Sequence, residues 1–373
     1  MKRRCVVCGA VWFGVLAVGL TIRADDLPND QAAESSLLRA AGGDGFRIHR
    51  TRHFSIAYNT DPDVLLDFVT RVEGTYNAVQ KFLSVNGLAH TALKARLEIL
   101  FFATTDQFSA YAAGTGANVS GAAGFYSPET NRAVFFDAAG APRVVELDAS
   151  IEELQRRLRD RKKVSRKVRK KWVKDLSRLR NQRNNFVDAI NELVVQHEVA
   201  HQVLFNCGLH TRGAMNPVWL VEGLACLFEP PLNTKGAGLA RVNTYRLGSL
   251  RRALSVNGDA LSARPTDLQN AFKHKRLVRP MQLIADRRLF DTTRPDVEIS
   301  YAEAWSLVFY LQRKHRDKLA QYLLNAARRP VGRTYSPVDE FDAFEHVFGP
   351  LDANFENGWI RFMLQQRYSE RTP

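Results

Sequence analysis

The side chains best suited to chemistry form one short pattern, His197-Glu198-Val199-Ala200-His201. Residues four positions apart share one face of an α-helix, so both imidazoles can bind the same metal ion. The carboxylate of Glu198 can then take a proton from water at that ion. Two structural histidines are the alternative interpretation, but imidazoles without partners are unfavourable on a buried apolar face. The pattern predicts a Zn²⁺ site with His197 and His201 as ligands and Glu198 as general base.

A catalytic zinc ion needs a third protein ligand, and known zinc sites supply it in two ways. One known pattern has a histidine six residues after the second histidine of the pair, but Cys207 stands there. The other has a carboxylate on a second helix, and Glu222 is the one charge in the middle of the apolar run 216–229. A buried carboxylate needs a cation, so Glu222 is predicted to be the third ligand. Glu229, at the end of the run, is interpreted as a surface acid.

Two helices have to position these side chains. A helix is expected over 185–208, because asparagine is a good N-cap and glycine a good C-terminal residue. A second helix is expected over 216–229, between an Asn-Pro pair and two prolines. Gly223 would let the second helix approach the first closely. Cys226 lies one turn after Glu222, where contact with a metal ligand or packing is expected rather than metal binding.

The rest of the chain separates into an early part with strands and a later part with helices. Strands are expected at 49–58, at 95–103 and, as a hairpin, at 124–137. Helices are expected at 61–83 and 105–111 between them, and helices alone follow the hairpin. Strands that cluster early and helices that cluster late predict an α+β fold.

The composition is that of an ordinary globular protein, with 373 residues of which 45% are apolar and 25% charged. This excludes a polytopic membrane protein, a collagen-like fibre and a chain disordered throughout. The net charge of +14 is local. Residues 152–183 carry +11 and the first 24 residues +4, so the remainder carries only −1.

The basic segment 151–184 contains neither glycine nor proline, and a thin apolar seam runs along it at helical spacing. One interpretation is a long solvated helix or helical hairpin that packs on the body through this seam. The other is an electrostatic grip on a polyanion, such as a cell-surface polymer or membrane headgroups. Nucleic acid is not expected, because no nucleic-acid-binding fold is recognisable and Trp172 is the one aromatic residue in the segment.

The amino terminus has the features of an export signal. Lys2-Arg3-Arg4 precedes an apolar run to Leu20, and a cut after Ala24 would remove the signal 1–24. An uncleaved membrane anchor is the alternative, although the run is short for a full span. A polar, flexible leader is expected over 25–45. Two cysteines then remain, Cys207 and Cys226, which form either a disulfide or two buried thiols.

The two site motifs resemble those of the gluzincin zinc metallopeptidases, and most of all the exported, largely uncharacterised bacterial peptidase-MA-like family. The likeness rests on the histidine pattern with Gln202 after it, on the segment Trp219-Leu-Val-Glu-Gly-Leu-Ala225 and on Phe228-Glu229. Weaker matches extend it over most of the chain: His53-Phe54, Gly124-Phe125-Tyr126, Phe135-Phe136-Asp137, Asn243-x-x-Arg246-Leu247 and Tyr301-Ala302-Glu303-Ala304-Trp305.

For the site, the resemblance implies one Zn²⁺ held by His197, His201 and Glu222, with Glu198 as base. Cys226 departs from the pattern, because many gluzincins carry an aspartate there that supports the metal ligands.

For the fold, the resemblance implies a zincin-like arrangement. A small twisted sheet with helices would occupy 46–150, and a mainly helical part would occupy 185–373. The basic segment 151–184 between them would be a variable insertion.

The expected reaction is hydrolysis of a peptide bond by zinc-activated water, with Glu198 taking the proton and returning it to the leaving amine. The developing oxyanion needs a further donor. Tyr301, at the start of a helix capped by Ser300, is the first candidate, with core packing as its alternative, and His210 is the second. The strand over 132–137 is expected at a sheet edge, where an extended peptide substrate can add to it.

Another class of function fits the same residues. An exported binding or scaffold protein could keep zinc for structure and attach to an anionic surface through its basic arm. Glu198 disfavours this interpretation, because a structural zinc site needs no base. A third hypothesis is that the protein hydrolyses another amide, such as a cell-wall peptide, instead of a protein substrate.

Overall fold

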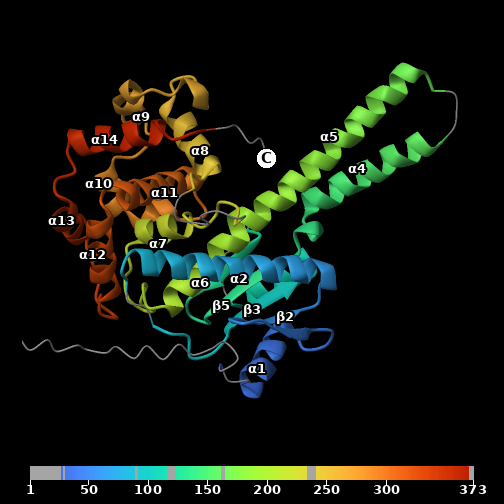
Figure 1. The fold of residues 1–373 in the computed structure, drawn as a ribbon, viewed down its shortest axis with the longest axis horizontal. Helices are drawn as coiled ribbons and strands as arrows, with labels where there is room; N and C mark the ends of the chain where they lie inside the picture. The colour runs from blue at the N-terminus through green and yellow to red at the C-terminus, as the bar shows by residue number, and fades with distance from the viewer. Residues whose placement is uncertain are drawn as a thin grey trace, which may run out of the picture.

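The computed structural model describes residues 27, 30–88, 91–115, 122–160, 164–232 and 241–368. The predicted export signal over 1–24 lies outside them and stays a prediction. Across the described residues the protein is α+β, with one mixed sheet near the amino terminus and helices over the rest of the chain, as the sequence predicts (Figure 1). None of the helices in this part is both long and apolar enough to cross a membrane.

The sheet is built from five short strands in the order β1-β2-β3-β5-β4. The two inner pairings, β2 with β3 and β3 with β5, are parallel, and both outer strands are antiparallel to their neighbours. The strands are β1 (Arg47–Arg50), β2 (Phe54–Tyr58), β3 (Leu97–Phe102), β4 (Gly124–Ser127) and β5 (Arg132–Phe136).

Helices alternate with the strands and then follow them. In the first half of the chain they are α1 (Gln31–Ala41), α2 (Pro62–Val85), α3 (Thr105–Thr115), α4 (Pro142–Arg159) and α5 (Arg166–Ile190). In the second half they are α6 (Gln196–Asn206), α7 (Val218–Ala225), α8 (Thr244–Leu254), α9 (Leu268–Lys273), α10 (Pro280–Ala285), α11 (Val297–Lys314), α12 (Arg316–Ala327), α13 (Pro337–Phe348) and α14 (Ala353–Leu364).

Successive side chains of a strand point to opposite sides of the sheet. Helices pack on both sides, so both faces of the sheet are buried. On one face, Phe101 of β3 stacks on Phe68 of α2 with ring centroids 4.1 Å apart, and α6 joins the same apolar core. On the other face, Phe102 packs in a separate core with residues of α1 and α3, among them Leu37 and Phe108. The helix that carries the histidine pattern is therefore seated directly on the sheet.

Several boundaries differ from the sequence-based expectations. The expected strand over 49–58 is a hairpin of β1 and β2, because residues 51–53 reverse the chain. The leader over 25–45 is not simply flexible, since Asp30 caps α1 and Leu37 is fully buried against the sheet. The strand over 132–137 is not an edge strand, because β5 lies between β3 and β4.

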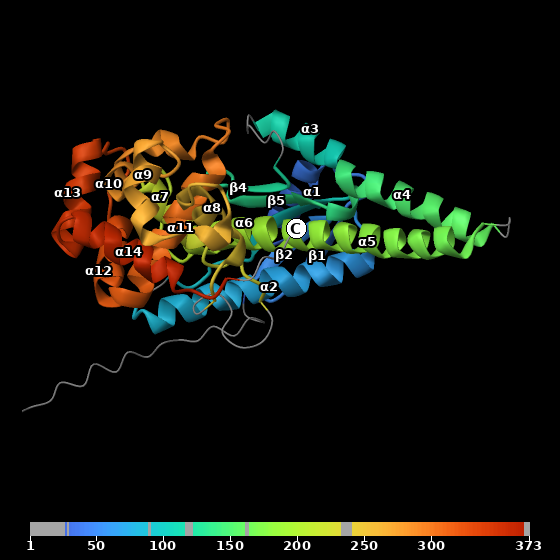
Figure 2. The same cartoon turned by 90° about the horizontal axis from the view of Figure 1, so that it is seen from above.

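The basic segment forms an antiparallel helical hairpin, α4 and α5, that projects from the body (Figures 1 and 2). The hairpin begins at Pro142, whereas the predicted insertion begins at residue 151. The predicted helix start at Asn185 is wrong, because α5 continues through a π-helical turn at Asn191–Val195 directly into α6. One unbroken helical path therefore joins the arm to the histidine pattern.

Candidate metal centre

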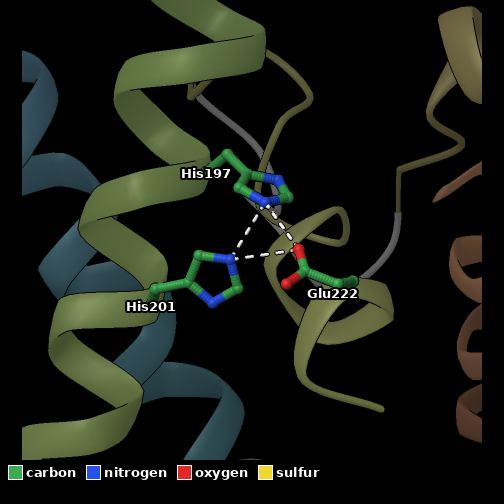
Figure 3. Close-up of side chains that lie close together, drawn as sticks. All are labelled: His197, His201 and Glu222. Carbon is green, nitrogen blue, oxygen red and sulfur yellow. Dashed lines mark hydrogen bonds and ion pairs between the residues drawn. The ribbon is translucent and has the colours of Figure 1, made fainter. Parts of the chain in front are cut away.

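Two histidines and a glutamate converge at the junction of α6 and α7. His197 Nε2 lies 3.0 Å from His201 Nε2 and 3.1 Å from Glu222 Oε2, and His201 Nε2 lies 3.2 Å from the same oxygen (Figure 3). All three ligand atoms thus face one point. Two imidazole nitrogens and one carboxylate oxygen form a donor set that suits a catalytic zinc ion with an open position. The structure brings together the three residues that the sequence singled out as ligands.

The charge balance favours an ionised Glu222. Burial raises the pKa of this carboxyl, but the neighbouring His201 and His197 outweigh that cost and hold the pKa far below its ordinary value. A carboxylate is the form that binds a cation. Glu222 therefore presents a negative charge between two imidazole nitrogens.

Glu198 lies beside this cluster and is held by the sheet. The backbone N–H of Tyr126, in the outer strand β4, donates to Glu198 Oε2 at 2.9 Å. Burial and the negative charge of Glu222 raise the pKa of Glu198, although the two histidines act against them. A carboxyl with a raised pKa is a better proton acceptor, as a general base requires.

The interpretation of Glu229 as a surface acid is wrong. Its side chain is completely buried, and its Oε1 lies 3.0 Å from Nδ1 of His197. A carboxylate on the second ring nitrogen orients a metal-binding histidine and leaves the other nitrogen free for the metal. The helix expected over 216–229 ends at Ala225. Residues 226–229 form a turn after it, and this turn brings the Glu229 side chain against His197.

The buried charge of Glu229 is compensated by a buried arginine. Arg246 donates through Nη2 to Glu229 Oε1 at 2.7 Å and through Nε to Oε2 at 2.9 Å. Asn243 Nδ2 adds a hydrogen bond to Oε2 at 2.5 Å. Burial alone would raise the pKa of Glu229, but Arg246 and His197 lower it to about 2. The sequence pointed to Asn243 and Arg246 only as weak motif matches, without a role.

Cys226 lies against the same histidine but does not complete a second metal site. Its Sγ is 3.8 Å from His197 Nδ1, so His197, Cys226 and Glu229 form another compact group of potential ligands. Arg246 already places a cation on Glu229, and burial together with Glu229 raises the pKa of the thiol to about 12. A neutral thiol beside an arginine is a poor cation site. Cys226 thus contacts the candidate ligand His197 from the buried side.

Two glutamines hold α6 in place. Gln196 donates through Nε2 to the carbonyl oxygens of Phe228 and Glu229, at 2.5 and 2.9 Å, and so fastens the turn that carries the Glu229 carboxylate. Gln202 donates to the carbonyl oxygens of Glu98 at 2.8 Å and Asn131 at 3.1 Å, which tie α6 to the sheet. Each glutamine stands next to one histidine of the pair.

Gly223 permits a close approach, but not the one expected. A methyl group at this position would lie 2.6 Å from the carbonyl oxygen of Ala304 and 2.7 Å from Val308, both in α11. The glycine therefore lets α7 pack on α11 rather than on α6. This contact positions α7, which carries Glu222 immediately before the glycine.

Tyr301 lies at the edge of the cluster. Its ring centroid is 6.0 Å from that of His197, and the guanidinium carbon of Arg246 is 5.3 Å from the centre of the ring. Burial and the charge of Glu222 raise the pKa of the phenol, so it stays protonated and able to donate. The helix does not begin at Ser300 as expected: α11 starts at Val297, and Tyr301 lies inside its second turn.

His210 is the second predicted donor, and it is buried near the cluster. Its side chain packs against Phe205, and neither ring nitrogen has a hydrogen-bond partner among the described residues. Burial and the nearby His201 lower its pKa to about 3, although Glu222 acts in the opposite direction. The imidazole is therefore neutral at physiological pH and keeps one N–H available.

Comparison with known proteins relates part of the chain to a protein family. A family model described as "Protein of unknown function (DUF1570)" matches residues 191–332, less than half of the chain. No curated protein and no solved structure matches this chain. The matched span includes α6, α7, α8 and α11, whereas the sheet and both helices of the arm lie outside it. The chain is thus similar to this family across the helices that build the metal centre.

Proposed function

We propose that this chain is an exported zinc-dependent metallopeptidase of the gluzincin type with a zincin-like fold. His197, His201 and Glu222 would hold one Zn²⁺. Zinc in such a site supplies a Lewis acid that acidifies water and polarises the substrate carbonyl. The observation that carries the proposal is the position of Glu198, a carboxylate with a raised pKa beside the three convergent ligand atoms.

The proton transfers fall to Glu198. It accepts the proton of the attacking water and then delivers it to the leaving amine. The hydrogen bond from the Tyr126 N–H fixes one carboxylate oxygen, so the other is left to exchange the proton. Glu229 holds the ring of His197 in the orientation that directs Nε2 toward Glu222.

The substrate site is assigned to β4. This strand is the outer strand on its side of the sheet, and it runs beside α6. An extended peptide added along β4 would pass the carboxylate of Glu198, which already contacts Tyr126 of this strand. The same relation between an antiparallel edge strand and the histidine helix supports the zincin-like assignment.

The oxyanion donor is assigned to Tyr301, with His210 as the competing candidate. Tyr301 is close to the ring of His197 and stays protonated because burial raises its pKa. A single positioned donor to an oxyanion contributes about 10²–10³ in rate.

The proposal is tested by metal analysis and by cleavage of a peptide library. The wild-type protein should bind one zinc ion, and Glu198→Gln should keep the metal while losing about 10²–10⁴ in rate. Glu129→Gln removes an exposed acid near the same edge and serves as the control, with activity unchanged. Zinc binding without any Glu198-dependent cleavage would favour the zinc-containing scaffold protein instead. Cleavage of cell-wall peptides alone would mean that the substrate is another class of amide.

A further inference from the structure

The charge of the helical arm is concentrated at its outer end. Among the described residues, 156–160 and 164–174 contain nine Lys or Arg and one acid, whereas 142–153 contain one Arg and four acids. Near the body, Asp148 and Arg183 form an ion pair across the two helices with Oδ1 and Nε 3.0 Å apart. A helix that only needed to be solvated would have no reason to separate its charges in this way.

The outer cations are exposed and repel one another. Arg166, Lys170 and Lys174 form a row at four-residue spacing along α5, and all three are exposed. None of them has an ion-pair partner in the described part of the chain. Like charges at this spacing destabilise a helix. The repulsion within this row therefore destabilises α5 in the isolated protein, and an external anionic partner would relieve it.

Apolar side chains are exposed among these cations. Val164, Val168 and Val173 are 37%, 38% and 55% exposed, and no residue of α5 is buried. A polymer of charged groups would contact only the ammonium and guanidinium groups. A bilayer surface also accepts valine side chains and the aliphatic stems of Lys and Arg at the headgroup level.

We propose that the outer end of the α4–α5 arm binds the surface of an anionic lipid bilayer. The arm projects away from the sheet and the C-terminal helices, so its end can reach a surface before the body does (Figures 1 and 2). Outside the basic segment and the amino-terminal signal the chain carries a net charge of only −1. Attraction to a negative surface therefore acts on the arm and orients the molecule.

The arm would also set the distance between that surface and the metal centre. From Lys171 to His197 the chain is helical throughout, so at 1.5 Å per residue the two lie roughly 40 Å apart. In a protein attached through the outer end of this helix, the metal centre would lie up to roughly 40 Å from the attached residues. The inference does not depend on the proposed peptidase activity.

The test is sedimentation of the full chain, without residues 1–24, with lipid vesicles. Vesicles of phosphatidylcholine containing one third phosphatidylglycerol should bind the protein, and vesicles of phosphatidylcholine alone should not. The triple variant Arg166→Gln, Lys170→Gln, Lys174→Gln should bind the anionic vesicles about a hundredfold more weakly, because each cation near such a surface contributes roughly a factor of five. Circular dichroism checks that the arm stays helical.

Two further variants make the result specific. Lys81→Gln, Lys94→Gln, Arg361→Gln removes three exposed cations from the body and should bind as the wild type does. Val173→Ser keeps the charge and should weaken vesicle binding while leaving retention on heparin unchanged. Equal binding by both triple variants would overturn the proposal, and so would binding to heparin but not to vesicles. Glu198→Gln should bind vesicles normally, which separates this result from the peptidase test.

Discussion

Nδ1 of His197 lies 3.0 Å from Oε1 of Glu229, a carboxylate that follows the predicted metal ligand Glu222 by seven residues. The resemblance to gluzincins proposed above would place an aspartate at the position of Cys226 for this purpose. In this protein the supporting carboxylate comes from the turn after α7 and is itself held by Arg246. His197 is therefore supported by Glu229 and not by a carboxylate at position 226.

Glu229→Gln tests this support. We expect metal affinity to fall about 10–100-fold, because the ring of His197 loses its charged partner. We also expect the free energy of unfolding to fall by about 3–5 kcal/mol, because Arg246 is left buried without its main counter-charge. Chelator competition and urea unfolding measure the two effects. Glu298→Gln, which removes the half-exposed partner of Arg246, should change both much less. Unchanged metal affinity in Glu229→Gln would contradict the assignment.

Tyr301→Phe tests the oxyanion donor. Removing the phenol hydroxyl should lower kcat about 10²–10³-fold and leave zinc content unchanged. Tyr245→Phe is a matched control, because its ring also lies against Arg246, with the guanidinium carbon 5.4 Å from its centre. Steady-state kinetics with a cleaved library peptide gives the comparison. Normal kcat in Tyr301→Phe with a low value in His210→Gln would transfer the role to His210.

His210 should make stability depend on pH. Burial lowers its pKa in the folded protein to about 3, against 6.5 for an ordinary histidine. The unfolded chain takes up this proton first as the pH falls, so the free energy of unfolding should decrease below about pH 6.5, by up to about 1.4 kcal/mol per pH unit.

Urea unfolding of His210→Gln as a function of pH measures this contribution. The variant should show a shallower decrease than the wild type, because glutamine does not titrate. His274→Gln, at an exposed position, should follow the wild-type curve. Parallel curves for the wild type and His210→Gln would mean that His210 is solvated in solution.

Gly223→Ala should disturb the packing of α7 on α11. The added methyl group would meet the carbonyl oxygen of Ala304 at 2.6 Å, which forces the helices apart. We expect a loss of about 1–3 kcal/mol in the free energy of unfolding and weaker zinc binding through displaced Glu222. Gly114→Ala, in α3, has open space around the new methyl group and should be neutral or slightly stabilising. Thermal unfolding and zinc titration distinguish the two variants.

Cys207 and Cys226 should behave as unreactive thiols. Both are buried and free, and burial raises their pKa values to about 11 and about 12. A thiol that stays protonated reacts slowly. In the chain without residues 1–24, a thiol reagent should modify neither cysteine in the native state and both after denaturation. Rapid native labelling, or a mass that shows a disulfide, would contradict this prediction.

Much of the fold could be predicted because the relevant signals are local. The proline at its first turn and its apolar stripe predict α2 closely, and the turn between two apolar arms predicts the hairpin of β4 and β5. The order of strands has no such signal. That β4 rather than β5 lies at the edge follows from the pairing of β5 with β3, and these strands are far apart in the sequence.

The sequence by itself determined the ligand pattern and the separation of charge. His197 and His201 share a face because of helical periodicity, and Glu222 stands out because an isolated charge in an apolar helix needs a partner. Only the tertiary structure decided that Glu229 and Arg246 are buried beneath His197, that α7 packs on α11, and that the arm continues into α6. Periodicity is a property of neighbouring residues. Which polar groups lose water and pair with one another depends on how distant segments pack.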